Sequence, residues 1–423
     1  ATHAGPLVSP RSGFQAGGGS SCREGFEQHE VVVAVRPGAV GRALPRSALN
    51  CMRKVCYQVN LQTTLGGGEI YTRFLTTALA SLGWSTVILV AGDAPFWPEL
   101  VGTQVELRKV SDGPSLMQAL PSEPGLILTH TALAEELASL VAMRHCLTGI
   151  AHMPLFEREP RGLKSYRRVF AVSEHVRASA LARGLGNVHP EPLYAVADLQ
   201  PRPDASNGRR SLYEWDRRKL RDRLLGLMEA CRPPGSASQR FERFRGLTLG
   251  IVSRLTPIKQ FPLMFSMLAP VIGAHPDFRL EIFGAGGYAS VRDLQRSLAP
   301  IRAQVRFWVR QSDVSAIYPQ LDYALSGLPE KEALGLNLIE AQMCGTPVLA
   351  VRAPPFTETV LEGLSGFLFE DPRRDQGAEF GRLIGRLRDR LDRPDPRNAT
   401  AHLARFSMAA FCARVERALA SVA

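Results

Sequence analysis

The segment Glu332–Val348 constrains the fold of this chain more than any other. It holds two glutamates, Glu332 and Glu340, with seven residues between them, and it ends in Gly-Thr-Pro before the apolar run Val348–Val351. Glycine and proline commonly follow the end of a helix, and a short apolar run bounded by them is typical of a buried strand. The segment therefore predicts a loop, a helix and a strand in succession.

The spacing of the two glutamates limits their chemistry. On one regular helix they would stand about 12 Å apart along the axis, beyond the roughly 5 to 9.5 Å between the carboxylates of glycoside hydrolases. If Glu332 lies in the loop before the helix, the amides of residues 333–335 are free at a positive helix terminus. Such a site suits an anionic ligand rich in hydroxyls. The alternative is that both glutamates are ordinary surface charges.

Glu332, Gly335, Glu340 and the Gly-Thr-Pro-Val sequence at 345–348 together resemble the signature of the retaining glycosyltransferases of family 4 (group 1), which have the GT-B fold. Leu334 stands where phenylalanine is commoner in that family. The resemblance implies an α/β protein of two Rossmann-like, doubly wound domains that face a central cleft. It also implies that the second domain holds most of a nucleotide-sugar donor.

Composition favours a globular protein with an anionic partner. With 423 residues, 45% of them hydrophobic and 22% charged, the chain is long enough for two domains. The 51 lysines and arginines exceed the 40 acidic residues by 11, which favours nucleic acid, a membrane surface or a phosphorylated substrate. Aromatic residues make up only 7% of the chain, and no stretch alternates them with basic residues. This argues against binding of single-stranded nucleic acid. An arginine-rich bacterial proteome is the alternative source of the charge.

The seven cysteines are scattered, and none has the spacing of a zinc site. We therefore expect reduced thiols in a cytoplasmic protein, without a structural metal. No apolar run approaches the ~18 residues of a membrane-spanning helix, so we expect any membrane contact to be peripheral.

Residues 1–51 have no periodic pattern and are rich in glycine and proline. From Met52 the sequence resembles the first strand of a bacterial α/β protein. We hypothesise that Met52 is the physiological start and that residues 1–51 are an unfolded extension. A chain that begins at Met52 is expected to keep full activity and stability.

A strand from Val55, the glycine turn Gly66–Gly68, a helix at about 70–82 and a strand at 86–90 predict a βαβ opening. The consecutive glycines are not a dinucleotide fingerprint, and a flexible turn is the alternative. In the resembled family, however, a Gly-Gly-any-Glu loop at this place turns its amides towards the donor phosphate. Gly66, Gly67 and Glu69 match that loop, with Gly68 at its free position.

Two histidines follow short apolar runs. His130 comes after the run 126–128 and His152 after the run 147–151, at the strand ends where open α/β sheets bind ligands. A structural hydrogen bond is the alternative role for either. The resemblance selects His152 as the residue beside the transferred sugar and leaves His130 as the weaker, acceptor-side candidate.

The segment Arg158–Arg168 carries five basic residues against one acidic residue. We interpret Arg158, Arg161 and Lys164 as an acceptor-side patch for anionic lipid headgroups or a phosphorylated acceptor. A solvated surface is the alternative. A strand is expected at 169–173.

The composition of the sequence changes over residues 200–245, which contain several prolines and one predicted charged helix at 213–228. This change marks a linker, with the domain boundary near residue 235. The last helix, expected at 398–422 after another at 376–391, commonly crosses back to the first domain in the GT-B fold. The expected division is an extension 1–51, an acceptor-side domain 52–235 with linker 200–235, a donor domain 236–395 and a C-terminal helix 396–423.

The second domain is expected to open with the strand Leu247–Val252 and a turn that enters a helix at about Phe261. Arg254 and Lys259 lie in this turn, where two cations at a helix N-terminus suit a diphosphate. Two exposed basic residues are the alternative. An Arg-Leu, a short turn and a lysine also resemble the phosphate-binding motif of the family.

Further strands are expected at 278–283, 305–309, 323–325 and 366–369. Gly284 follows the first of these in a close-approach turn. By resemblance, Val309 lies where such enzymes contact the base of the donor. The donor-binding residues predicted from all these patterns are Gly66, Gly67, Gly68, Arg254, Lys259, Gly284, Val309, Glu332, Ala333, Leu334, Gly335, Leu336 and Glu340.

The resemblance implies transfer of a sugar from a nucleotide diphosphate sugar to a hydroxyl with retained configuration. Arg254 and Lys259 would neutralise the leaving diphosphate, Glu332 and His152 would orient the sugar, and Glu340 would bind the ribose.

No carboxylate of the first domain is an obvious nucleophile, so we favour a front-face mechanism. No Asp-any-Asp motif is evident, so neither a metal nor another cofactor is expected. Family and charge suggest a saccharide or lipid-linked acceptor in cell-surface polysaccharide or lipopolysaccharide synthesis, at the inner face of the cell membrane. A nucleotide-sugar epimerase and a non-catalytic nucleotide-binding protein are the alternatives; the missing fingerprint disfavours an NAD-dependent enzyme.

Overall fold

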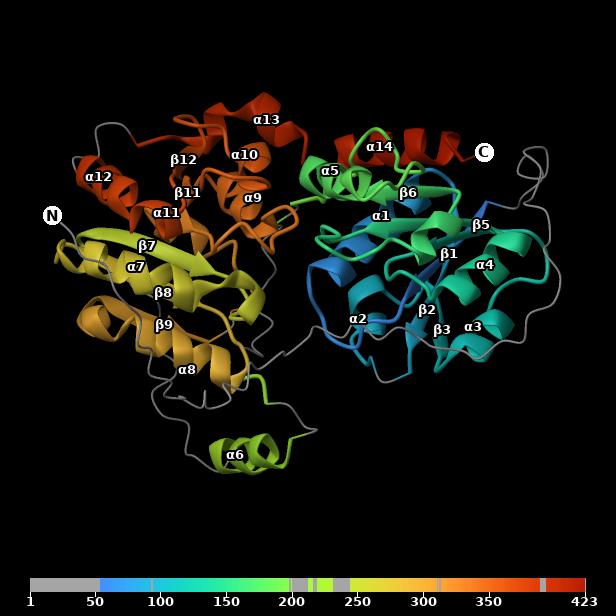
Figure 1. Cartoon of the computed structure of the whole chain (residues 1–423), viewed down its shortest axis with the longest axis horizontal. Coiled ribbons are helices and arrows are strands. Elements are labelled where there is room, and N and C mark those ends of the chain that lie inside the picture. The colour runs from blue at the N-terminus through green and yellow to red at the C-terminus, as the bar shows by residue number, and fades with distance from the viewer. Residues whose placement is uncertain are drawn as a thin grey trace, which may run out of the picture.

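The computed structural model describes residues 54–422 except 93, 198, 200–211, 216–218, 231–243, 310, 312 and 389–392. The predicted extension 1–51 and the predicted boundary near residue 235 lie outside these residues. The described chain forms two α/β domains, each built around a six-stranded sheet (Figure 1). This architecture confirms the expected fold class.

The first sheet has the strand order β3-β2-β1-β4-β5-β6, and all its pairs are parallel. Its strands are β1 (Val55–Asn60), β2 (Ser85–Ala91), β3 (Glu106–Val110), β4 (Leu126–Thr129), β5 (Cys146–Ala151) and β6 (Arg168–Ala171). Its helices are α1 (Gly67–Ser81), α2 (Trp97–Val101), α3 (Gly113–Ala119), α4 (Glu135–Arg144) and α5 (Glu174–Ala182), with the 3-10 turn η2 (Gly162–Ser165). Leu126 and Leu128 enter one apolar core and Ile127 enters another, because successive side chains of a strand point to opposite faces. Both faces of the sheet are therefore covered, as parallel sheets require.

The second sheet has the order β12-β11-β10-β7-β8-β9 and is also parallel. Its strands are β7 (Leu247–Val252), β8 (Phe278–Phe283), β9 (Val305–Trp308), β10 (Tyr323–Leu325), β11 (Val348–Val351) and β12 (Gly366–Phe369). Its helices are α7 (Phe261–Gly273), α8 (Tyr288–Ser297), α9 (Leu336–Met343), α10 (Phe356–Thr359), α11 (Pro372–Asp375) and α12 (Ala378–Leu387), with 3-10 turns η3 (Pro257–Lys259), η4 (Ala299–Gln304) and η5 (Tyr318–Gln320). Strand β7 is buried along its whole length. Packing is so close there that a Cβ at Gly250 would lie 2.2 Å from Leu321 Cδ1.

In both sheets the strand order reverses beside the first strand. Strand β1 lies between β2 and β4, and β7 lies between β8 and β10. Ligands of open α/β sheets bind outside the carboxyl ends of the strands at such a switch point. The loops that follow β1, β4, β7 and β10 are therefore the expected place of a site.

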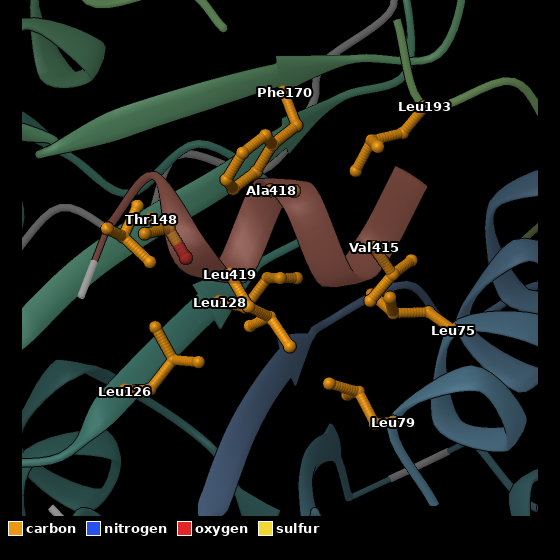
Figure 2. A pocket seen from close by; sticks show the side chains of 11 residues that line it. Leu75, Leu79, Leu126, Leu128, Thr148, Phe170, Leu193, Val415, Ala418 and Leu419 are labelled. Atoms are coloured by element: carbon orange, nitrogen blue, oxygen red, sulfur yellow. The ribbon is translucent and has the colours of Figure 1, made fainter. Parts of the chain in front are cut away.

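The C-terminal helix α14 (Met408–Ala420) packs on the first domain although it follows the second in the chain. The buried Phe411 ring lies 5.4 Å from the Tyr71 ring of α1, and Arg417 pairs with Glu191. Figure 2 shows side chains from α14, α1 and the strands turned towards one another around a small apolar cavity. Its lining is Leu75, Leu79, Leu126, Leu128, Thr148, Phe170, Leu193, Val415, Ala418, Leu419 and Val422.

Two predicted helices were wrong in extent. The helix expected at 398–422 is divided into α13 (Thr400–Ala404) and α14, after the 3-10 turn η6 (Pro396–Asn398), because Ser407 caps α14 by accepting from the Ala410 amide at 3.2 Å. The helix expected at 213–228 is α6 (Leu220–Ala230). Tyr213 instead forms a parallel bridge with Gly286, where strand-like pairing satisfies its backbone.

Replacement of Phe411 by alanine should destabilise the first domain. The ring is fully buried between α14 and α1, so its loss should lower the free energy of unfolding by about 3–5 kcal/mol. Urea denaturation followed by circular dichroism measures the change, with Glu416→Ala on the exposed side of α14 as control. Equal midpoints for the two variants would contradict the docking of α14.

Candidate active site

The predicted site residues lie in loops at the carboxyl ends of strands in both domains. The glycine turn follows β1, His130 follows β4, His152 follows β5, the Arg254–Lys259 turn follows β7, and Glu332 follows β10. Direct contacts join these loops across the domains. Ser173 Oγ donates to the Ala333 carbonyl at 2.6 Å.

Close backbone packing fixes the Arg254–Lys259 turn. A Cβ at Gly284 would lie 2.0 Å from the Ser253 carbonyl oxygen, and one at Gly327 would lie 2.1 Å from the Lys259 carbonyl oxygen. Only glycine fits at such distances. Gly284 therefore positions the turn, a role that the sequence pattern alone did not distinguish from donor contact.

Lys259 and Glu332 form an ion pair in which both side chains are largely buried, with 20% and 13% of their surfaces exposed. Glu332 Oε1 also accepts from the amides of Ala333 at 3.3 Å and Gly335 at 3.4 Å. The expectation that these amides are free is therefore wrong in this structure, because the adjacent carboxylate satisfies them. Gly335 has φ of 79° and precedes α9, a conformation that favours glycine.

Glu340 lies within α9, so the two glutamates belong to a loop and a helix as the spacing suggested. Burial raises the pKa of its carboxyl group to about 7, against opposing effects of the Tyr318 hydrogen bond and the Lys259 charge. The Tyr318 hydroxyl donates to Glu340 Oε2 at 3.3 Å. A polar ligand here would meet an acceptor whose charge depends on pH.

The glycine turn meets the second domain at Arg254. A Cβ at Gly66 would lie 3.1 Å from Arg254 Nη1, whereas at Gly67 and Gly68 it would meet none of the described atoms within 4 Å. Gly67 and Gly68 form the first turn of α1, and the Glu69 carboxylate accepts from the Gly66 amide at 2.7 Å. Helix α1 thus begins three residues earlier than expected, with its N-terminus facing Arg254.

His130 and His152 form a pair. His130 Nδ1 lies 3.0 Å from His152 Nε2, and His130 Nε2 lies 2.8 Å from Gln58 Oε1. Burial lowers the pKa of both rings, that of His152 to about 4. Both rings are therefore neutral at physiological pH.

A chain of hydrogen bonds fixes the tautomers. Thr76 Oγ1 donates to the Thr72 carbonyl, so it must accept from Gln58 Nε2, at 2.8 Å in each case. Gln58 Oε1 then accepts from the Nε2–H of His130. His130 Nδ1 in turn accepts from the Nε2–H of His152. His152 is left with an unprotonated Nδ1, an acceptor for a hydroxyl group.

The other predicted residues lie outside this group. Arg161 pairs with Glu159 at 2.5 Å on the surface, and η2, which carries Lys164, packs on α4. Val309 follows β9 at the far edge of the second sheet. Arg158 is exposed; Leu334 is buried, and Leu336 is partly buried against the first-domain core.

Comparison with known proteins relates the second domain to a known family. Residues 242–387 match the family model "Glycosyl transferases group 1". A D-inositol 3-phosphate glycosyltransferase of Corynebacterium kroppenstedtii is 32% identical over 42% of each chain. One from Segniliparus rotundus is 28% identical over 89% of this chain and 91% of its own. Residues 242–387 therefore form a group 1 glycosyltransferase domain.

Solved structures show the same fold. Anabaena HepE, crystallised with UDP-glucose, has a TM-score of 0.65 at 17% identity, covering 87% of this chain and 99% of its own. Sucrose-phosphate synthase from Thermosynechococcus elongatus has a TM-score of 0.62 at 17% identity, covering 86% and 98%. The two-domain chain therefore has the GT-B fold, as the resemblance implied.

Sequence patterns missed a residue that joins the two domains of the glycosyltransferase. The Glu358 carboxylate on α10 accepts from the amides of Glu174 at 2.8 Å and His175 at 2.7 Å, at the N-terminus of α5. Tyr194 Oη also donates to it at 3.1 Å. Ser173 caps the N-terminus of α5 by accepting from the Val176 amide, but nothing near Glu358 in the sequence indicates that it binds there.

The described residues contain no cluster of three or more histidines, cysteines or carboxylates able to hold a metal ion. No helix among them is both long and apolar enough to span a bilayer.

We predict that His152 and His130 both carry their proton on Nε2. Long-range proton–nitrogen correlation spectra of the ¹⁵N-labelled protein distinguish the two tautomers. Gln58→Leu removes the terminal acceptor and should let both tautomers appear, with circular dichroism as the check on folding. A protonated Nδ1 on either ring of the parent protein would contradict the hydrogen-bond chain.

Proposed function

We propose that this protein transfers a sugar from a nucleotide diphosphate sugar to an acceptor hydroxyl with retention of configuration. Two observations carry the proposal: Arg254 lies beside the Gly66 backbone of the other domain, and Lys259 pairs with Glu332. All four residues lie in loops that follow the carboxyl ends of strands. One ligand bound here could contact the cations, the glycine backbone and the carboxylate at the same time.

Arg254 and Lys259 are proposed to bind the diphosphate. Arg254 has 42% of its side chain exposed and stands beside the N-terminal turn of α1. Two cations and a helix N-terminus stabilise charge that develops on a leaving phosphate. They supply the charge that a divalent ion supplies elsewhere, so we propose a reaction without metal or other cofactor.

The donor sugar is proposed to lie between Glu332 and His152. Glu332 would accept hydrogen bonds from sugar hydroxyls. Nδ1 of the neutral His152 ring would accept from another hydroxyl without adding a charge to the site. In the front-face step, the bond from the anomeric carbon to phosphate oxygen breaks as the bond to the acceptor oxygen forms on the same face. The acceptor proton passes to the departing phosphate, so no protein base is needed.

The donor base and the acceptor are proposed from relatives. HepE was solved with UDP-glucose, and a relative from Corynebacterium glutamicum is named as GDP-mannose-dependent, acting on a phosphatidylinositol monomannoside. Relatives named for D-inositol 3-phosphate favour a phosphorylated polyol. We propose a phosphorylated or lipid-linked precursor of cell-surface saccharide, polysaccharide or lipopolysaccharide, with Arg158, Arg161 and Lys164 facing anionic headgroups at the inner membrane face.

Lys259→Ala should lower the rate of transfer about a hundredfold or more, because the leaving diphosphate loses a charged donor, and Arg254→Ala should act in the same direction. Sugar transfer from UDP- and GDP-sugars to an inositol phosphate measures the rates. Lys331→Ala is the matched control, an exposed lysine that directly precedes Glu332. Parent activity in Lys259→Ala would overturn the donor site.

Nucleotide-sugar affinity should rise as the pH passes through about 7, the raised pKa of Glu340. Burial favours the protonated form of Glu340. If binding needs the carboxylate, Glu340 must release a proton below that pH, so affinity falls about tenfold for each pH unit below it. Titration calorimetry at several pH values measures the slope. Glu340→Gln should bind more weakly and show no such slope; a flat parent profile would contradict the ribose contact.

A further inference from the structure

Helix α6 exposes a stripe of large apolar side chains. Leu220, Leu224, Leu227 and Met228 have 69%, 56%, 65% and 63% of their surfaces exposed. The last three follow Leu220 by four, seven and eight residues, a spacing that puts all four on one face of the helix. In Figure 1, α6 stands apart from both sheets.

Basic residues border this stripe on one side. At about 100° per residue, the exposed Arg223 falls at one edge, and the exposed Lys219 precedes the helix on the same side. Arg221 at the other edge turns inward: it donates to the buried Asp222 at 2.8 Å and lies over the Tyr288 ring of α8 at 5.1 Å. The outward face of α6 is therefore apolar at its centre and positive along one margin.

The inward face is anchored to the second domain. Tyr213 bridges Gly286, the loop after β8, and the Glu214 amide donates to the Gly286 carbonyl at 2.8 Å. Gly226 packs on Trp215, where a Cβ would lie 3.2 Å from Cδ1. The same short segment reaches the donor site, because Glu214 lies 3.9 Å from Arg254 Nη2.

We propose that α6 docks on the surface of an anionic lipid bilayer. The stripe would enter the boundary between headgroups and acyl chains, and Lys219 and Arg223 would meet lipid phosphates. Four side chains on a convex helix fall well short of the ~800 Å² per partner of a stable protein interface, whereas a bilayer requires no shaped groove. The surface differs from the Arg158–Arg168 patch and does not depend on the transfer reaction.

Vesicle co-sedimentation tests this surface without donor or acceptor. The parent protein should bind vesicles that mix phosphatidylcholine with phosphatidylglycerol, and binding should weaken with salt or with phosphatidylcholine alone. Leu224→Glu/Leu227→Glu should bind at least tenfold more weakly. The matched control is Leu181→Glu/Leu263→Glu, the same change at leucines 43% and 45% exposed on other helices; it should bind as the parent does. Circular dichroism verifies the fold of both.

Three results would overturn the proposal. One is parent-like vesicle binding by the Leu224→Glu/Leu227→Glu protein. Another is binding to phosphatidylcholine alone that equals binding to the mixed vesicles, which would leave the basic residues beside the stripe without a role. The third is a parent dimer in sedimentation velocity that the α6 change dissociates, which would make the stripe a protein interface. Failed sugar transfer by the parent would overturn the proposed function and leave the vesicle result unaffected.

Discussion

The ion pair between Lys259 and Glu332 joins the turns that follow β7 and β10, the two neighbouring strands at the switch point of the second sheet. Both side chains are mostly removed from water, so each charge depends on the other for compensation. The Glu332 carboxylate also holds the amides of Ala333 and Gly335. It thereby occupies the cation and the helix terminus that a phosphate would use. A diphosphate that binds Lys259 must take over part of this pairing, which ties donor binding to the geometry of the loop before α9.

That loop is held from the first domain as well. Ser173 donates to the Ala333 carbonyl, and the amides of the next two residues, which begin α5, donate to Glu358 of α10. Buried charge-assisted hydrogen bonds of this kind are strong and directional. The position of Glu332 is therefore a property of the whole two-domain assembly. Helix α14 adds to this coupling, because it leaves the second domain and packs its Phe411 on α1, whose N-terminus faces Arg254.

Local patterns in the sequence were enough to predict the second sheet almost residue by residue. Strands β7, β8 and β12 begin and end as expected, since each is a short apolar run between turn residues. Strand β3 was missed because Glu106–Val110 is a partly exposed edge strand with charged side chains. The pairing of His130 with His152 and that of Glu358 with α5 were missed for another reason: the partners are far apart in the chain, and only tertiary structure brings them together. The sequence ranked the two histidines as rivals, whereas their hydrogen bond makes one the support of the other.

Burial gives the two sides of the site opposite electrostatic character. On the first domain it keeps His130 and His152 neutral, with Nδ1 of His152 as an acceptor. On the second domain Arg254 remains 42% exposed and charged. A neutral acceptor suits the sugar hydroxyls, where no charge develops, and cations suit the leaving diphosphate, where it does. In the proposed reaction, a cationic His152 would repel the positive charge that develops on the sugar as its bond to phosphate breaks. If the proposed site is correct, the hydrogen-bond chain from Gln58 keeps a neutral acceptor, rather than a charge, beside the sugar.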